Sequence, residues 1–195
     1  MTTKSFLKEI AFIFHSLRLI PHFLVFKYKC TKGDVEALKY KEDTRYFKKE
    51  GGFFKVLFKR REYISILYCR LQLTGNILSI LGPNYPIKLP KSPNMEGGIY
   101  VDHPHYTRIG AERIGRNFKT KHNVTIGNNK GGVPIIGDNV FIGVGAVVIG
   151  KIKIGNNVKI GANSVITKDV PDNCTVIGNP AYIIRMNGEI VNIKL

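Results

Sequence analysis

A repeat of six residues, running from Ile136 to Pro171, is the feature that most restricts how this chain can fold. The first place of each repeat holds a β-branched aliphatic residue, and the fifth a small or β-branched one. The fourth place is mostly Asn or Gly, which enter left-handed backbone conformations at low cost. Each repeat therefore predicts a short extended piece followed by a corner. Written in sixes, the segment reads IGDNVF, IGVGAV, VIGKIK, IGNNVK, IGANSV and ITKDVP.

A period of six is incompatible with an amphipathic helix, whose period is 3.6 residues. Three corners close a triangle, so three repeats form one turn of a prism with the aliphatic positions inside. The pattern predicts a mainly β fold, a parallel β-helix in which each turn covers its neighbour. An earlier copy, at Ile114, Thr120 and Ile126, stays in phase only if a loop is inserted at about residues 128–134.

The segment before the β-helix is predicted to be a helical region over residues 1–81. Apolar residues follow helical spacing from Lys4 to Leu19, and Pro21 is expected to end that helix. Four prolines in LGPNYPIKLPKSPN then end the helical pattern. The β-helix domain is therefore expected to span residues 82–195, including a C-terminal tail at 172–195.

Within the helical region, single residues predict where helices begin and end. Asp34 is expected to cap the second helix, and Gly51 with Gly52 to end it. A further helix is expected from about Phe54 to Leu81, with a break near Gly75. The region is thus predicted to be a small set of packed helices.

The net charge of +16, from 30 basic and 14 acidic residues, predicts attraction to polyanions such as nucleic acid, an anionic membrane or a phosphorylated small molecule. No recognisable RNA- or DNA-binding motif accompanies this charge, so nucleic-acid binding is the least favoured interpretation. Cys30, Cys69 and Cys174 lack metal-site spacing and are too few for a disulfide framework. They predict a reducing, cytoplasmic location and no metal site.

The apolar stretch at residues 10–26 is interrupted by Arg18, Pro21 and two histidines, so it is a poor membrane span. It also lacks the features of a signal peptide. Packing against the rest of the protein is its expected role. The alternative is peripheral contact with the anionic inner surface of a membrane, favoured by the neighbouring residues Lys27, Lys29 and Lys32.

The repeats, the segment GGIYVDHP and the ending ITKDVPDNCTVIGNPAYIIR resemble the hexapeptide-repeat acyltransferases. Among these, the chain is similar to serine acetyltransferases and to their relatives in capsule and surface-polysaccharide gene clusters. The similarity covers about residues 15–186 and is strongest from Gly97 onward. The resemblance implies a left-handed β-helix, acetyl-CoA as the donor, and a homotrimer with active sites between adjacent β-helices. It indicates an O-acetyltransferase that acts on a hydroxyl acceptor.

The resemblance aligns His103, in the stretch YVDHPHYT, with a histidine that acts as general base. A hydroxyl has too high a pKa to attack a thioester unaided, whereas an imidazole, with a pKa of about 6.5, accepts a proton near neutral pH. In an extended segment His105 would point with His103, and Asp102 away from both. His105 and Asp102 are secondary catalytic candidates. No Ser or Cys has the setting of a nucleophile, which predicts direct transfer.

The resemblance also implies the residues that hold acetyl-CoA. CoA is a polyanion with a flexible apolar arm, so small residues allow its close approach and basic residues neutralise its phosphates. Tyr182 stands where sugar-acetylating relatives often carry Arg. The positions aligned with the pantetheine arm are Val144, Gly145 and Ala162, and those near the nucleotide are Thr167, Lys168, Tyr182 and Arg185.

Three departures from the serine acetyltransferases favour a sugar of a surface polysaccharide, or its precursor, as the acceptor. Lys88 stands where relatives often carry the acidic residue that orients the histidine. The inserted loop also lacks the second histidine that serine acetyltransferases have there, and the helical region is short. Serine acetylation in cysteine biosynthesis is the alternative.

A third interpretation is a hexapeptide scaffold without catalytic activity, which binds other proteins or a metal. A zinc site of the γ-carbonic-anhydrase type needs three histidines across a subunit interface. His103, His105 and His122 would have to supply them. Their setting matches the Asp-His-Pro motif of the acyltransferases, at residues 102–104, better than it matches a zinc site.

Overall fold

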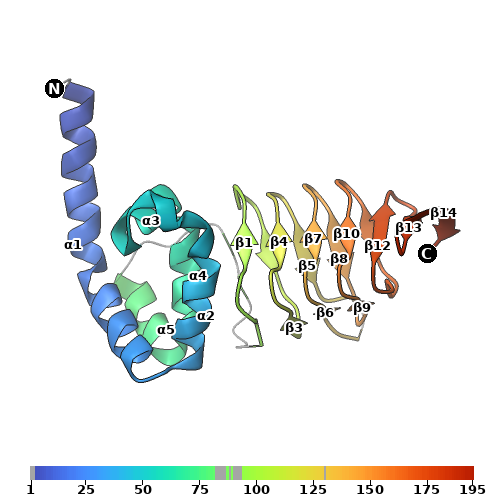
Figure 1. The fold of residues 1–195 in the computed structure, drawn as a ribbon, viewed down its shortest axis with the longest axis horizontal. Coiled ribbons are helices and arrows are strands. Elements are labelled where there is room, and N and C mark those ends of the chain that lie inside the picture. Colours follow the sequence, from blue (N-terminus) through green and yellow to red (C-terminus); the bar gives the residue numbers. More distant parts are fainter. Residues whose placement is uncertain (1–2, 82–86, 88, 90–93, 130) are drawn as a thin grey trace. The chain divides into compact units, whose positions relative to one another are not determined.

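The computed structural model describes residues 3–81, 87, 89, 94–129 and 131–195. The chain divides into two compact units, Met1–Tyr85 and Pro86–Leu195. The first unit is helical and the second is a stack of short strands (Figure 1). The boundary expected after Leu81 lies close to this division.

The helical unit contains five α-helices and one 3₁₀ helix within the described residues. Pro21 lies inside the first helix, so the prediction that it ends that helix is wrong. Leu19 and His22, on either side of it, are 0% and 1% exposed, and this packing holds the helix together although proline removes one backbone hydrogen bond. The elements are α1 (Thr3–Thr31), α2 (Val35–Asp43), η1 (Arg45–Glu50), α3 (Phe53–Lys59), α4 (Glu62–Arg70) and α5 (Gln72–Leu81).

Two helix boundaries follow the local sequence as predicted. The Asp34 carboxylate accepts hydrogen bonds from the backbone N–H groups of Glu36 and Ala37, which confirms it as the N-cap of α2. Gly51 adopts a left-handed conformation, with φ 88°, and ends η1. The chain between these residues is not one α-helix, because α2 gives way to the 3₁₀ helix after Thr44.

The predicted break at Gly75 is wrong, because Gly75 lies inside α5 and the breaks fall at Arg60 and Leu71. A β-carbon at position 75 would lie 1.9 Å from the carbonyl oxygen of Tyr68 in α4. Gly75 therefore permits the close approach of two helices.

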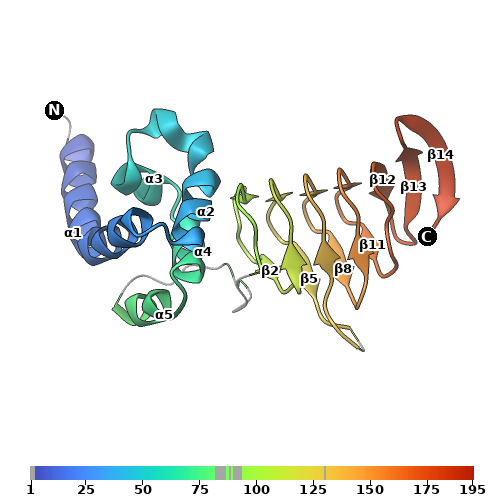
Figure 2. The same cartoon turned by 60° about the horizontal axis from the view of Figure 1, so that its bottom comes forward.

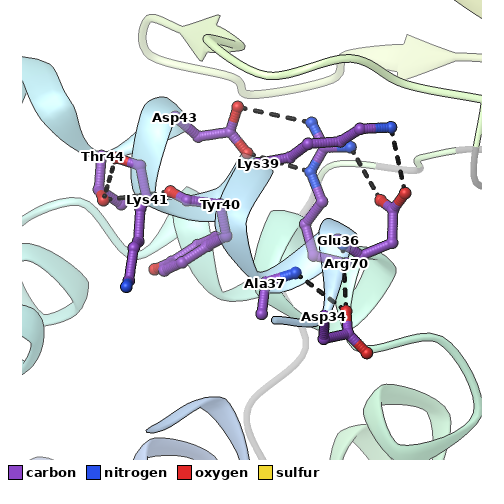
Figure 3. A network of polar contacts seen from close by, with 9 residues as sticks. All are labelled: Asp34, Glu36, Ala37, Lys39, Tyr40, Lys41, Asp43, Thr44 and Arg70. Carbon is purple, nitrogen blue, oxygen red and sulfur yellow. Dashed lines mark hydrogen bonds and ion pairs between the residues drawn. The ribbon is translucent and has the colours of Figure 1, made fainter. Parts of the chain in front are cut away.

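A buried cluster of charges joins α2 to α4 (Figure 3). The Arg70 guanidinium, 1% exposed, donates to Glu36 at 3.2 Å and to Asp43 at 3.1 Å. Lys39 lies 3.2 Å from Glu36 on the outer side. Removing one partner from such a cluster typically costs about 3–5 kcal/mol, because the other charge is left buried. The charged residues of this cluster therefore belong to the core of the helical unit.

The second unit is a parallel β-helix with three sides, as predicted (Figures 1 and 2). Each side is a sheet made of strands from successive turns. The first sheet has the order β1-β4-β7-β10-β12-β13-β14, the second β11-β8-β5-β2 and the third β3-β6-β9. All pairs are parallel except those of the last two strands, β13 and β14.

The strands are short because a corner follows each of them. Their bounds are β1 (Tyr100–Val101), β2 (Arg108–Ile109), β3 (Arg113–Ile114), β4 (Lys119–Thr120), β5 (Thr125–Gly127), β6 (Ile135–Ile136), β7 (Phe141–Ile142), β8 (Val147–Ile149), β9 (Lys153–Ile154), β10 (Lys159–Ile160), β11 (Val165–Ile166), β12 (Cys174–Ile177), β13 (Tyr182–Met186) and β14 (Glu189–Lys194).

The repeat positions have the roles that the sequence predicts. The first-place residues, such as Ile142 and Ile160, are fully buried inside the prism. Asn139 and Asn157 at the fourth place have φ of 57° and 56°, which confirms them as corners. The side-chain amide of Asn139 donates to Asn157 at 3.0 Å, so successive corners are also joined to each other.

The strand pairing locates the inserted loop. Phe141 pairs with Lys159, which is 18 residues later and therefore one full turn of three repeats. Lys119 pairs with Phe141, which is 22 residues later. Four extra residues thus lie between β5 and β6, within the loop expected at residues 128–134.

Among the described residues, no single helix has the length and hydropathy needed to cross a membrane. Two segments of α1, Lys8–Phe14 and Ser16–Thr31, meet these criteria only when taken together, and they are bent by 41° relative to each other.

Replacing Gly75 with Ala should destabilise the helical unit. In an open helix this change is favourable by about 1 kcal/mol. Here the added methyl group meets a backbone oxygen, and we expect a net loss of about 1–3 kcal/mol. Thermal unfolding followed by circular dichroism measures the difference. Leu73→Ala is the control in the same helix, because Leu73 is 74% exposed. A Gly75→Ala protein more stable than the unmodified one would contradict the close approach.

Candidate active site

The stretch YVDHPHYT forms a corner of the first turn of the β-helix. Strand β1 ends at Val101, and His103 has a left-handed backbone with φ 50°. The N–H of His105 donates to the carbonyl oxygen of His103 at 2.8 Å. The motif is therefore a tight turn and not an extended strand, so side chains do not alternate between two faces there.

This turn brings Asp102 to His103, against the expectation that the two side chains point apart. Oδ1 of Asp102 lies 3.5 Å from Nε2 of His103. The other carboxylate oxygen, Oδ2, accepts a hydrogen bond from Nζ of Lys121, in the next turn. That bond and the charge of Asp102 raise the pKa of Lys121. The expectation failed because alternation applies only as far as the end of β1.

The Asp102 carboxylate thus stands between a lysine and a histidine. An acidic group beside one ring nitrogen leaves the other nitrogen available to accept a proton. The side chain of His103 is 71% exposed, whereas that of Asp102 is 16% exposed. The imidazole thus faces the carboxylate on one side, while most of the ring is exposed to solvent. Lys121 was not expected from the sequence, since its role depends on the stacking of turns.

The same corner recurs in the following turns and gathers residues that are distant in sequence. The backbone oxygens of His105, His122 and Val144 accept hydrogen bonds from Asn123, Gly145 and Asn163. These bonds stack His105, His122, Val144 and Ala162 in one column. Turns of a β-helix are about 4.8 Å apart, so His105 and Val144 are separated by roughly 10 Å along the axis.

Small residues allow successive turns to stack closely in this column. Gly145 is left-handed with φ 68°, and a β-carbon there would lie 2.2 Å from the side-chain oxygen of Asn163. A β-carbon at Gly143 would lie 2.7 Å from the backbone nitrogen of Ala162. The geometry brings the candidates Val144, Gly145 and Ala162 to the corner that carries the histidine motif.

The remaining cofactor candidates lie towards the C-terminal end of the β-helix. Thr167 and Lys168 follow β11 and are exposed at the next corner, one side of the prism away from Ala162. Tyr182 begins β13 and is half-buried. Arg185 is exposed on β13 and pairs with Thr175 of β12. The fold therefore does not place these four residues in the column of Val144 and Ala162.

The thiols are poorly suited to act as nucleophiles. Burial raises the pKa of Cys69 to about 11. Burial also raises the pKa of the Cys30 and Cys174 thiols. A nucleophilic cysteine needs the opposite, a pKa lowered towards neutrality.

Two further expectations concern metal and the orientation of the histidine. Within the described part of the chain, no three residues of His, Cys, Asp and Glu lie close enough to hold a metal ion. Lys88, the position where relatives often carry an acidic residue, lies outside the described residues.

The sequence comparisons agree with the repeat seen in the fold. Residues 134–168 match the family described as "Bacterial transferase hexapeptide (six repeats)". A serine acetyltransferase of Synechococcus elongatus is 42% identical over 96 residues, covering 47% of this chain and 39% of the relative. The chain spans less than half the length of the curated relatives that it matches.

The solved structures give the same result for the fold. Neisseria gonorrhoeae serine acetyltransferase in complex with serine aligns with a TM-score of 0.59 at 26% identity. The alignment covers 82% of this chain and 73% of that one. A serine acetyltransferase in complex with CoA aligns with a TM-score of 0.53 at 22% identity, over 82% of this chain and 74% of that one.

The fold and the repeat together define a hexapeptide-repeat β-helix, and at this level the chain is similar to the acyltransferases that its sequence resembles. At the finer level, the comparisons favour the serine acetyltransferases. They do not support the preference for a surface-polysaccharide relative that the sequence suggested.

Proposed function

We propose that this protein is an O-acetyltransferase that moves the acetyl group of acetyl-CoA to a hydroxyl acceptor, with His103 as the general base. One observation carries the proposal: a single corner of the β-helix joins an exposed histidine, backed by Asp102, to the column of Val144 and Ala162. The likeness to serine acetyltransferases supports it.

In the proposed reaction a free ring nitrogen of His103 takes the proton of the acceptor hydroxyl. The oxygen attacks the thioester carbonyl, the C–S bond breaks, and the CoA thiolate leaves with the proton that the imidazolium returns. Asp102, 3.5 Å from the ring, stabilises the positive charge that develops on it. The protein forms no covalent intermediate, which agrees with the raised pKa of the Cys69 thiol.

In this scheme acetyl-CoA lies along the outside of the β-helix. Its pantetheine arm follows the column of Val144, Gly145 and Ala162, which are half-buried to exposed residues at the corner. Its phosphates reach Thr167, Lys168 and Arg185, with Tyr182 beside them, and the net charge of +16 favours such a polyanion.

We propose serine as the acceptor, because serine acetyltransferases are the relatives that the chain resembles in both sequence and fold. A sugar hydroxyl is the second candidate. It is favoured by the inserted loop at residues 128–134, NNKGGVP, which contains no histidine.

The proposed assembly is a homotrimer, located in the cytoplasm. His103 is 71% exposed in the single chain, so a neighbouring β-helix is needed to enclose the acceptor and exclude water. The free thiols of Cys30, Cys69 and Cys174 support a reducing compartment.

Replacing His103 with Ala should lower the turnover number by roughly 10²- to 10⁴-fold, the usual contribution of a positioned general base. CoA binding and the trimer should persist, because an exposed corner side chain adds little to stability. Steady-state kinetics, calorimetric titration with CoA and light scattering measure the three quantities.

His105→Ala is the matched control, since this exposed histidine lies in the same turn. It should retain most of the activity. If His105→Ala abolished turnover while His103→Ala preserved it, the role of base would pass to His105.

Replacing Lys168 with Ala should raise the KM for acetyl-CoA by about fivefold and leave turnover nearly unchanged. A charge contact distant from the reacting carbonyl stabilises the ground and transition states alike. Lys159→Ala is the control, because Lys159 is an exposed lysine on β10 that is not assigned to CoA. Equal KM values for the two variants would show that Lys168 does not contact the cofactor.

A further inference from the structure

Helix α1 has a second apolar face that the helical unit leaves exposed. Its members recur at spacings of three and four residues, which return to one side of a helix. They are between 41% and 66% exposed. We call this set the α1 stripe, and it consists of Ile13, Phe14, Leu17, Ile20, Leu24 and Tyr28.

The opposite side of α1 is already used for packing. Leu19 is fully buried, and the rings of Phe23 and Phe26 lie 5.3 Å from that of Phe53. His22, 1% exposed, contacts the Tyr68 hydroxyl at 3.1 Å. The α1 stripe is therefore not the core face of the helix. Exposed apolar patches of this kind usually mark a contact with another molecule or a membrane.

Basic residues border the α1 stripe. Arg18 and Lys27 are exposed and lie on the two sides of it. The Lys32 ammonium lies 5.9 Å from the ring centre of Tyr28, at the C-terminal end of the stripe. Residues 3–31 carry five basic residues and one acidic residue. An apolar face flanked by Lys and Arg, with aromatic residues among its members, is the pattern of helices that lie in a membrane interface.

We propose that the α1 stripe docks the protein on an anionic lipid surface, with α1 lying in the plane of the interface. The charge of the bordering residues favours a lipid surface, rather than a second copy of the chain, as the contact of the α1 stripe. A symmetric pair would bring the same basic borders together, and like charges repel. Anionic headgroups attract them instead. The inference is independent of the proposed acetyl transfer.

The test is co-sedimentation of the full chain with vesicles of phosphatidylcholine, with and without phosphatidylglycerol. We expect binding to the vesicles that contain phosphatidylglycerol and its weakening by salt. The double variant Leu17→Ser/Leu24→Ser should lower the partition coefficient at least about tenfold. The matched control is Val35→Ser/Leu38→Ser on α2, whose side chains are 62% and 42% exposed and lie outside the stripe.

A second variant separates charge from apolar contact. Arg18→Gln/Lys27→Gln should remove most of the preference for phosphatidylglycerol. Because this variant leaves the α1 stripe intact, it still tests the proposal if Leu17→Ser/Leu24→Ser fails to fold. Absence of binding of the unmodified protein to vesicles that contain phosphatidylglycerol would overturn the proposal. So would a change of oligomeric state in light scattering for Leu17→Ser/Leu24→Ser with no change in vesicle binding, because the occupant would then be a second copy.

Discussion

Stacking of the β-helix turns is the constraint on which the second unit depends. A turn of short strands has no core of its own, and it becomes stable only when the aliphatic residues of its neighbours cover it. Ile142, Ile160 and their equivalents are fully buried for that reason. Stacking requires the corners to fall at equivalent positions in successive turns. Asn and Gly residues with left-handed backbone conformations form these corners.

The same constraint builds the candidate site. Because every turn repeats its corner, residues 17 to 22 positions apart become neighbours along one edge, as His105, His122, Val144 and Ala162 do. The edge carries the imidazoles of His105 and His122 at one end and the smaller residues Val144 and Ala162 towards the other. That arrangement suits an extended cofactor and a hydroxyl that must lose a proton, which is why the proposed chemistry follows from the stacking.

Much of the fold could be predicted because its signals are local and repeated. The repeat from Ile136 gave the β-helix, and Asp34 gave a helix cap that the structure confirms. The failures at Pro21 and Gly75 have a common cause, since tertiary packing maintained a helix through residues that usually interrupt one. At the site, His103 was found through a motif, whereas the Asp102 contact depends on a turn and the Lys121 contact on the next coil. The acceptor depends on surfaces outside the repeat, so fold alone does not determine it.

Release of free thiol from acetyl-CoA measures whether the protein transfers the acetyl group to a hydroxyl. The purified full chain is assayed with serine, with a panel of sugars and nucleotide sugars, and without an acceptor. We expect release that depends on a hydroxyl acceptor, is supported by serine and is lost in His103→Ala. Release with sugars alone would keep the transferase and change its acceptor. If the protein binds CoA but releases no thiol in response to any acceptor, the proposed acetyl transfer is wrong.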